Sequence, residues 1–372
     1  MFPIPIISQY GNVLPSTDVI KKVQSHLDTV MVLSSTGNLY GIGLNSEGQL
    51  GTGSTDTVSS WTLVNTNVLD FWCSHTNVTV INKNDGTWFS TGKQRPFNGS
   101  STNDVQFVDR TSFFGTILAD SGTIKSVSIS DYSVLCTTVD GSVYRSGYNL
   151  YGQLFTGNTT SISTLTKSTE VNVQKALTDE SGFNSYVLYN DGTLKGAGNN
   201  TYSQLNDSST TSKTSLQTIS TEVLNYWVGP QALFVLKSDG LYSAGRNSSG
   251  QLGTGTSNST ANMLAKVSSL IPVDMVSTQG LSHFYVQDGT VYGTGANQYG
   301  IGTGSSDTII TSFTEVPDFK GYVELSHGQN RSYVIKNQRL YACGLYNSTY
   351  NVLPDYTSTV QVLSALNVKG IV

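Results

Sequence analysis

A two-residue turn motif recurs along the whole chain at an almost constant interval. Its second position, usually glycine, returns every 48 to 55 residues through seven copies. The copies are Thr36-Gly37, Asp85-Gly86, Asp140-Gly141, Asp191-Gly192, Asp239-Gly240, Asp288-Gly289 and the degenerate Asn337-Gln338. A repeat of this length is typical of solenoids, propellers and other arrays of one small unit. The chain is therefore expected to consist of seven related units.

Two further marks accompany the turn in most copies. An aromatic residue follows the glycine position by three residues, or by two in the fifth unit: Tyr40, Phe89, Tyr144, Tyr242, Tyr292 and Tyr341. A second glycine follows by six residues, or by five in the fifth unit: Gly43, Gly92, Gly147, Gly198, Gly245, Gly295 and Gly344. Three marks recurring together make a chance repeat very improbable.

Each turn lies between two β-rich runs, such as residues 30–33 and 39–40. Asp-Gly between such runs predicts a β-hairpin, because glycine takes the positive φ of a tight turn without strain. A further run precedes the hairpin, as at 19–23, and another follows it, as at 61–64, which makes four short strands per unit. We therefore expect an all-β fold, a seven-bladed β-propeller of four-stranded antiparallel blades, as one domain over residues 1–372 with almost no helix. Residues 3–8 and 367–372 are expected to meet where the ring closes.

The loop after the second glycine also repeats. It reads GLNSEGQLGTG at residues 43–53 and GRNSSGQLGTG at 245–255, with partial copies from Gly147, Gly198 and Gly295. This string, after an Asp-Gly hairpin and at this period, resembles the regulator-of-chromosome-condensation repeat family over nearly the whole chain. The resemblance implies a seven-bladed propeller, here a divergent one. The loop residues have a structural explanation: glycine permits unusual backbone, Asn bonds its own backbone, and Leu anchors the loop on the next blade.

The low charge of the chain excludes several classes of partner. Charged residues make up 12% of the sequence and the net charge is −5, while Ser and Thr together make up about a quarter. No run of basic residues is present to bind a phosphate backbone, so we expect neither nucleic acid nor membrane as a partner. Residues 1–10 do not have the pattern of a secretory signal, and no stretch is apolar enough to span a membrane.

No catalytic, cofactor or metal motif is apparent, and we expect neither an enzyme nor a bound cofactor. His26, His75 and His327 precede the turn position by the same 11 residues. They would share a metal only if that position lay close to the axis of the ring, and packing or loop hydrogen bonding is the favoured interpretation. The cysteines, Cys73, Cys136 and Cys343, are far apart and odd in number, which favours buried free thiols.

One loop position is aromatic in three units. Tyr151, Tyr202 and Tyr299 occupy it, where the first and fifth units have Glu47 and Ser249. Connections alternate between the two faces of a propeller, so the three tyrosines should share the face opposite the Asp-Gly turns. Tyrosine provides large contact area at low entropic cost, which suits a protein interface. The alternative interpretation is that each ring packs on its own loop.

These observations favour a non-enzymatic propeller that binds a protein partner or belongs to a larger assembly. A surface rich in hydroxyl and amide groups is consistent with an exposed component of a phage or other virion. Two alternatives come from the family resemblance: a guanine-nucleotide exchange factor-like regulator of a small GTPase, and an enzyme inhibitor. No loop residue of this chain matches a known site of either activity.

Overall fold

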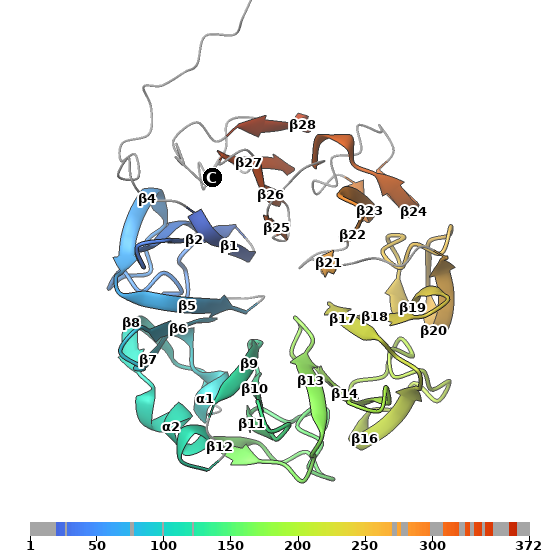
Figure 1. Cartoon of the computed structure of the whole chain (residues 1–372), viewed down its shortest axis with the longest axis horizontal. Helices are drawn as coiled ribbons and strands as arrows, with labels where there is room; N and C mark the ends of the chain where they lie inside the picture. Colours follow the sequence, from blue (N-terminus) through green and yellow to red (C-terminus); the bar gives the residue numbers. More distant parts are fainter. Residues whose placement is uncertain are drawn as a thin grey trace, which may run out of the picture.

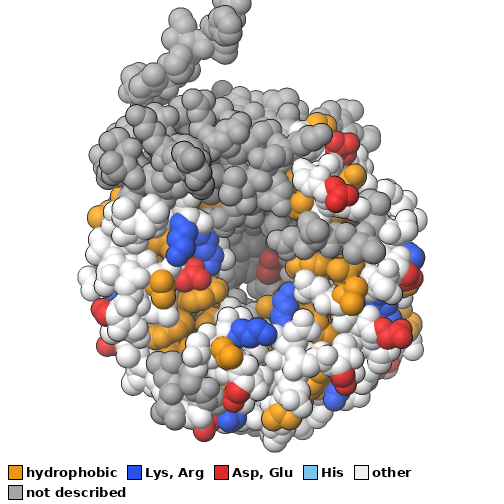
Figure 2. Space-filling view, viewed as in Figure 1, with side chains coloured by type: hydrophobic (Ala, Val, Ile, Leu, Met, Phe, Trp, Pro, Cys, Tyr) orange, Lys and Arg blue, Asp and Glu red, His pale blue; other side chains and the backbone are white. Residues whose placement is uncertain are grey.

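The chain forms an all-β propeller whose sheets surround a central hollow (Figures 1 and 2). The computed structural model describes residues 20–26, 28–74, 78–98, 100–120, 123–269, 274–276, 282–297, 308–319, 324–327, 331–336, 339–344 and 357–362. Within these residues the sheets are four-stranded and antiparallel. The prediction of an all-β propeller with four-stranded blades is confirmed.

The described strands form seven sheets, and in each sheet the strands pair in sequence order. The first two are β1 Ile20–His26, β2 Thr29–Ser34, β3 Leu39–Gly43, β4 Val58–Asn65, and β5 Val68–Cys73, β6 Val78–Lys83, β7 Trp88–Lys93, β8 Asn103–Asp109. The third and fourth are β9 Ile124–Ile129, β10 Ser133–Thr138, β11 Val143–Gly147, β12 Ile162–Lys167, and β13 Val173–Thr178, β14 Asn184–Tyr189, β15 Leu194–Gly198, β16 Lys213–Ser220. The fifth is β17 Asn225–Gly229, β18 Ala232–Lys237, β19 Gly240–Asn247, β20 Asn258–Ser268. The last two are β21 Asp274–Val276, β22 Ser282–Gln287, β23 Thr290–Ala296, β24 Ile309–Glu315, and β25 Glu324–His327, β26 Arg331–Lys336, β27 Arg339–Gly344, β28 Thr357–Val362.

The hairpin glycines also join neighbouring blades. Gly37 and Gly141 have φ angles of +83° and +81°, a region that favours glycine. Their carbonyl oxygens accept hydrogen bonds from the first residues of the next blades, Val68 and Val173, at 2.9 and 3.1 Å. A Cβ on Gly141 would lie 3.0 Å from the Val173 nitrogen. The glycine therefore serves both the tight turn and the close approach of the next blade.

Lysines of the inner strands form a second link between blades. Lys22 Nζ of β1 donates to the Phe71 carbonyl of β5 at 2.6 Å, and Lys175 Nζ of β13 donates to the Tyr226 carbonyl of β17 at 2.8 Å. Lys22 also pairs with Asp70. Figure 2 shows Lys and Arg side chains around the central hollow. Because these lysines bond acceptors of the next blade, they contribute to the ring rather than standing free in solvent.

The leucine that recurs in the glycine loops is buried between blades. Leu50 packs in one cluster with Phe71 and Ile81 of the second blade. Leu252 likewise packs in one cluster with Tyr285 of the sixth blade. The prediction that this leucine anchors its loop on the neighbouring blade is confirmed in both units.

The expectation of almost no helix is wrong on both sides of β8, the last strand of the second blade. A short helix, α1 Arg95–Asn98, precedes β8, and a longer one, α2 Thr111–Asp120, follows it. Phe114 and Ile117, three residues apart on one face of α2, are fully buried, and the Phe114 ring stacks on Trp88 at 4.4 Å. The repeat interval is longest here, and the additional residues form a helix that covers the blade instead of an extended loop. A 3₁₀ turn spans Pro317–Phe319.

The first and last sheets lie side by side (Figure 1). Their inner strands β1 and β25 are in contact, and the backbone N–H of Ser25 donates to Ser326 Oγ at 2.9 Å. The two segments expected to close the ring, 3–8 and 367–372, lie outside the described residues. Their role in closure remains a prediction.

Candidate functional site

In four of the glycine loops the asparagine holds the loop in shape. Its Oδ1 accepts the backbone N–H of the leucine five residues later, at distances from 2.8 to 3.0 Å: Asn45–Leu50, Asn149–Leu154, Asn200–Leu205 and Asn247–Leu252. Its Nδ2 bonds the end of the same loop, as in the 2.8 Å contact from Asn45 to the Ser54 carbonyl. These contacts confirm the structural interpretation of the motif in the four loops.

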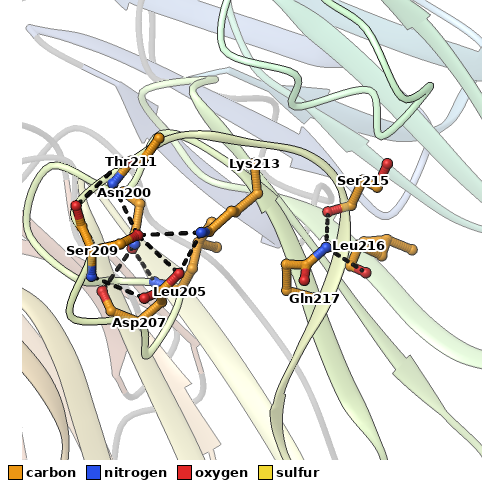
Figure 3. A network of polar contacts seen from close by, with 9 residues as sticks. All are labelled: Asn200, Leu205, Asp207, Ser209, Thr211, Lys213, Ser215, Leu216 and Gln217. Atoms are coloured by element: carbon orange, nitrogen blue, oxygen red, sulfur yellow. Dashed lines mark hydrogen bonds and ion pairs between the residues drawn. The ribbon is translucent and has the colours of Figure 1, made fainter.

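The fourth blade's loop ends differently from the others, in the polar network of Figure 3. Asp207 accepts the backbone N–H of Ser209 at 2.9 Å and its hydroxyl at 3.0 Å, and it forms an ion pair with Lys213. The Lys213 contact, followed by the Ser209 hydrogen bonds, lowers the pKa of Asp207 to about 2. Asn200 Nδ2 donates to the Asp207 carbonyl at 3.0 Å. The network fixes the loop end where the first and fifth units have a Gly-Thr-Gly sequence.

Tyr151 and Tyr202, two of the three predicted interface residues, occupy equivalent loop positions. In both loops a glutamine Oε1 accepts the tyrosine backbone N–H: Gln153 at 3.0 Å and Gln204 at 2.9 Å. Both side chains are partly buried. Tyr299 lies outside the described residues, so its place on the same face remains a prediction.

Each of these two tyrosines contacts the next blade rather than the other tyrosine. The Tyr151 ring meets Phe183 of the fourth blade edge-on, with centroids 4.9 Å apart. The Tyr202 ring lies 5.8 Å from the Arg246 guanidinium of the fifth blade. They therefore belong to two separate inter-blade contacts, and the interface interpretation has to be argued for each one by itself.

A larger group of aromatic side chains surrounds Tyr151. The Phe183 ring lies 5.4 Å from Tyr132, which lies 5.6 Å from Tyr148. We call Tyr132, Tyr148, Tyr151 and Phe183 the aromatic cluster. All four rings are partly exposed, and they come from three loops of the third and fourth blades. The guanidinium of Arg95, in α1, lies 5.3 Å from the Tyr132 ring.

The topology places the aromatic cluster on the face opposite the Asp-Gly hairpins. In every sheet the connections from first to second and from third to fourth strand emerge on one face, and hairpins and blade-to-blade connections emerge on the other. We call the first of these the loop face. Leu150, beside Tyr151 on the loop face, is 54% exposed. Leu224, in the connection to β17 on the hairpin face, is 53% exposed.

Only part of the aromatic cluster was accessible to sequence reasoning. Tyr132 and Phe183 lie in the turns between the first and second strands of their blades, β9–β10 and β13–β14. Both precede the hairpin glycine of their unit by nine residues, but that repeat position is aromatic in these two units alone. A comparison restricted to these turns would reveal two aromatics in adjacent units, but not that Tyr151 meets one of them.

Two buried acidic side chains belong to the turns that carry the aromatic cluster: Asp131 directly precedes Tyr132, and Asp179 lies four residues before Phe183. Asp131 forms an ion pair with Lys93 at 3.1 Å and accepts the Ser74 hydroxyl at 3.0 Å. Asp179 is 1% exposed, and its Oδ1 accepts the backbone N–H groups of Phe183 and Asn184 at 2.8 and 3.1 Å. Burial raises the pKa of Asp179 to about 7, although these hydrogen bonds act in the opposite direction.

The histidines and cysteines do not add a reactive site in the part of the chain that is described. His26 and His327 end the inner strands β1 and β25, and His75 lies outside the described residues. Cys73 and Cys136 are free thiols, and burial raises the pKa of both, that of Cys73 to about 12. Across the described ranges no three potential metal ligands gather. No helix among them is long and apolar enough to cross a membrane.

Comparison with known structures agrees with the fold. No family model matches the chain. The structure is similar to Prp20p from Saccharomyces cerevisiae, with a TM-score of 0.71 and 16% identity over 85% of this chain and 82% of that one. In fold, the chain resembles the RCC1-like propellers. Human WBSCR16 is also similar, with a TM-score of 0.68 and 18% identity over 86% and 87% of the two chains. Yeast RCC1 (Prp20) bound to Kap60 is similar as well, with a TM-score of 0.70 and 16% identity over 95% of this chain and 85% of that one.

Proposed function

We propose that this chain is a non-enzymatic propeller that docks on a partner protein through the loop face of its third and fourth blades. The aromatic cluster is the observation that carries the proposal. Four partly exposed rings lie together, and the exposed Leu150 directly precedes Tyr151, in a chain with few charges. Aromatic side chains dominate the binding energy of protein interfaces, and apolar patches on a soluble protein mark contact sites.

The structural neighbours support protein binding as a use of this fold. Prp20p has been characterised for binding to Gsp1p and histones, and Prp20 has been crystallised with Kap60. Gsp1p, histones and Kap60 are partners of Prp20. For this chain the proposal rests on the aromatic cluster.

A pair of leucines gives a matched test of the docking face. A photo-crosslinking amino acid at position 150 is compared with the same amino acid at position 224, which is equally exposed on the hairpin face. We expect position 150 to crosslink one protein of the native source in a saturable way, and position 224 not to do so. Equal crosslinking at both positions, or none at 150, would contradict the proposal.

We further propose that the partner belongs to a larger particle, and that this chain is an exposed component of a virion. The support is compositional: a surface rich in hydroxyl and amide groups suits a permanently exposed structural protein. Purifying the native particle should recover the chain in stoichiometric amount. Accelerated nucleotide release from a small GTPase, or inhibition of an enzyme, would instead favour one of the two alternative functions.

We also propose that residues 1–372 form one ring of seven blades that belongs to the regulator-of-chromosome-condensation repeat family. The contact between β1 and β25 supports closure. Deleting residues 1–11 should then lower the melting temperature markedly, since an opened ring exposes unpaired strand edges. An unchanged melting temperature would contradict closure through that segment.

A further inference from the structure

The guanidinium group of Arg95 lies beside the aromatic cluster and has hydrogen-bond donors available for an anion. Arg95 stacks on Tyr132 at 5.3 Å and is partly exposed. Stacking on an aromatic ring holds the planar guanidinium in a defined orientation and leaves its edge available for hydrogen bonds. Within the described ranges, neither an ion pair nor a hydrogen bond of the Arg95 side chain is found.

Other cations in comparable positions are occupied. Lys93, two residues earlier, is paired with Asp131. Arg110 is paired with Asp104 at 2.9 Å. Arg246, which also stacks on a tyrosine of the loop face, donates to Ser248 at 3.1 Å and to Gln231 at 3.4 Å. Arg95 therefore differs from these cations in having its donors available next to exposed aromatic rings.

The two buried acidic groups of the cluster's turns, Asp131 and Asp179, are not partners of Arg95. Asp131 is buried and is bound by Lys93 and Ser74. Asp179 is buried, and its Oδ1 faces the backbone N–H groups of its own loop. Arg95 pairs with neither of these two acids, so its donors remain available to an anion from another molecule.

We infer that Arg95 and the aromatic cluster form one recognition site for a partner segment in which an acidic residue adjoins an apolar one. The inference rests on the proposed docking function. The carboxylate binds the guanidinium edge through two parallel hydrogen bonds, and the apolar side chain covers the rings of Tyr132 and Phe183. A single guanidinium matches the single charge of a carboxylate, whereas a phosphate would call for more than one cation.

The test uses a displayed library of random 12-residue peptides, selected on the intact protein. Enriched peptides should carry Asp or Glu within two residues of an aromatic or aliphatic residue. A synthetic peptide of that kind should bind Arg95→Gln roughly 10- to 100-fold more weakly, the loss of a charge-assisted hydrogen-bond pair. Changing the acidic residue of the peptide to its amide should weaken binding similarly, and the two changes combined should cost little more than either one.

Two variants control the measurement. Arg246→Gln removes another guanidinium that stacks on a tyrosine of the loop face, and peptide affinity should not change. Arg95→Lys keeps the charge but not the planar fork, and should recover only part of the affinity. Melting temperatures of all three variants establish that each is folded.

The outcomes separate this inference from the docking proposal. Peptides that bind the aromatic cluster without an acidic residue, or equal affinity for Arg95→Gln, would overturn the inference and leave docking intact. Failure to enrich any peptide, together with specific crosslinking at position 150, would also overturn the inference alone. Failure of both experiments would overturn both proposals.

Discussion

The carboxylate of Asp179 accepts a hydrogen bond from the backbone N–H of Phe183 at 2.8 Å, so a buried acid orients the loop that carries the central ring of the aromatic cluster. Phe183 in turn contacts Tyr132 and Tyr151. The protonation of Asp179 is thus coupled by direct contact to the loop face. A second buried titratable residue, His283, packs edge-on against Phe234 at 4.9 Å.

Asp179 and His283 should make opposite contributions to the pH dependence of stability. Burial raises the pKa of Asp179 from 3.8 to about 7. The stability that this acid contributes is complete below pH 3.8 and is lost as the pH rises to about 7. Burial lowers the pKa of His283 from 6.5 to about 3. Its contribution is complete above pH 6.5 and is lost as the pH falls toward 3.

The two contributions overlap between about pH 4 and 6.5, and there they should largely cancel. Asp179→Asn leaves only the histidine effect, so its free energy of unfolding should rise with pH across this window. His283→Gln should show the opposite slope. Either slope is at most about 1.4 kcal/mol per pH unit, and urea unfolding at pH 4.5, 5.5 and 6.5 measures it. Parallel pH profiles for the two variants would contradict the assignment.

A loop position that favours glycine offers a second prediction. Ser203 has a φ of +58° where the third unit has Gly152 at +80°. Non-glycine residues pay about 1 to 2 kcal/mol for left-handed backbone, so Ser203→Gly should stabilise the protein by up to about 1 kcal/mol. The reverse change, Gly152→Ser, is the matched control and should destabilise, because its Cβ would lie 2.5 Å from the Thr214 Cα of the next blade. Urea unfolding of both variants checks the signs, and a destabilised Ser203→Gly would contradict the strain argument.

The repeat marks were sufficient to predict the regular part of the fold. Gly37 and Gly141 are needed at positive φ wherever a hairpin meets the next blade, so they recur and are visible in one sequence. Helix α2 was not predictable in this way, because it occurs once and its two buried residues, Phe114 and Ile117, are too few for a clear period.

The candidate site was only partly predictable for a related reason. Tyr151 was found because it occupies a loop position that is aromatic in three units, whereas the position shared by Tyr132 and Phe183 is aromatic in only two. Arg95 belongs to α1, outside the strands of its repeat. Residues that vary between repeats distinguish one part of the ring from another, and a search for similarity does not detect them.

The lysine contacts between inner strands predict unequal costs of substitution. Lys175 is partly buried and donates to two acceptors of the fifth blade, the Tyr226 carbonyl at 2.8 Å and Asn225 Oδ1 at 3.0 Å. Lys125 is exposed and donates to the Gln174 carbonyl at 2.8 Å. Lys175→Met should lower the free energy of unfolding by about 1 to 2 kcal/mol, and Lys125→Met by less than about 0.5 kcal/mol. Equal losses in denaturant titrations would show that burial does not determine how much these lysine hydrogen bonds stabilise the protein.

The two described tyrosines of the loop face should behave differently when truncated. Tyr151→Ala removes a ring from the aromatic cluster, so it should lower the affinity for the selected peptide by roughly 1 to 4 kcal/mol, the range of an interface hot spot. It should also lower stability modestly, because the contact with Phe183 is lost. Tyr202→Ala removes a ring that contacts Arg246 at another blade junction. It should lower stability and leave affinity unchanged.

Melting temperature and peptide affinity, measured on the same two variants, separate interface from packing roles. Because the proposed site uses one ion pair, that of Arg95, affinity should fall only slightly between low and physiological salt. If Tyr151→Ala melts earlier but the folded molecules bind the peptide normally, its ring serves only to pack the third blade on the fourth. The docking site would then have to be sought elsewhere on the loop face, beginning with the position of Tyr299.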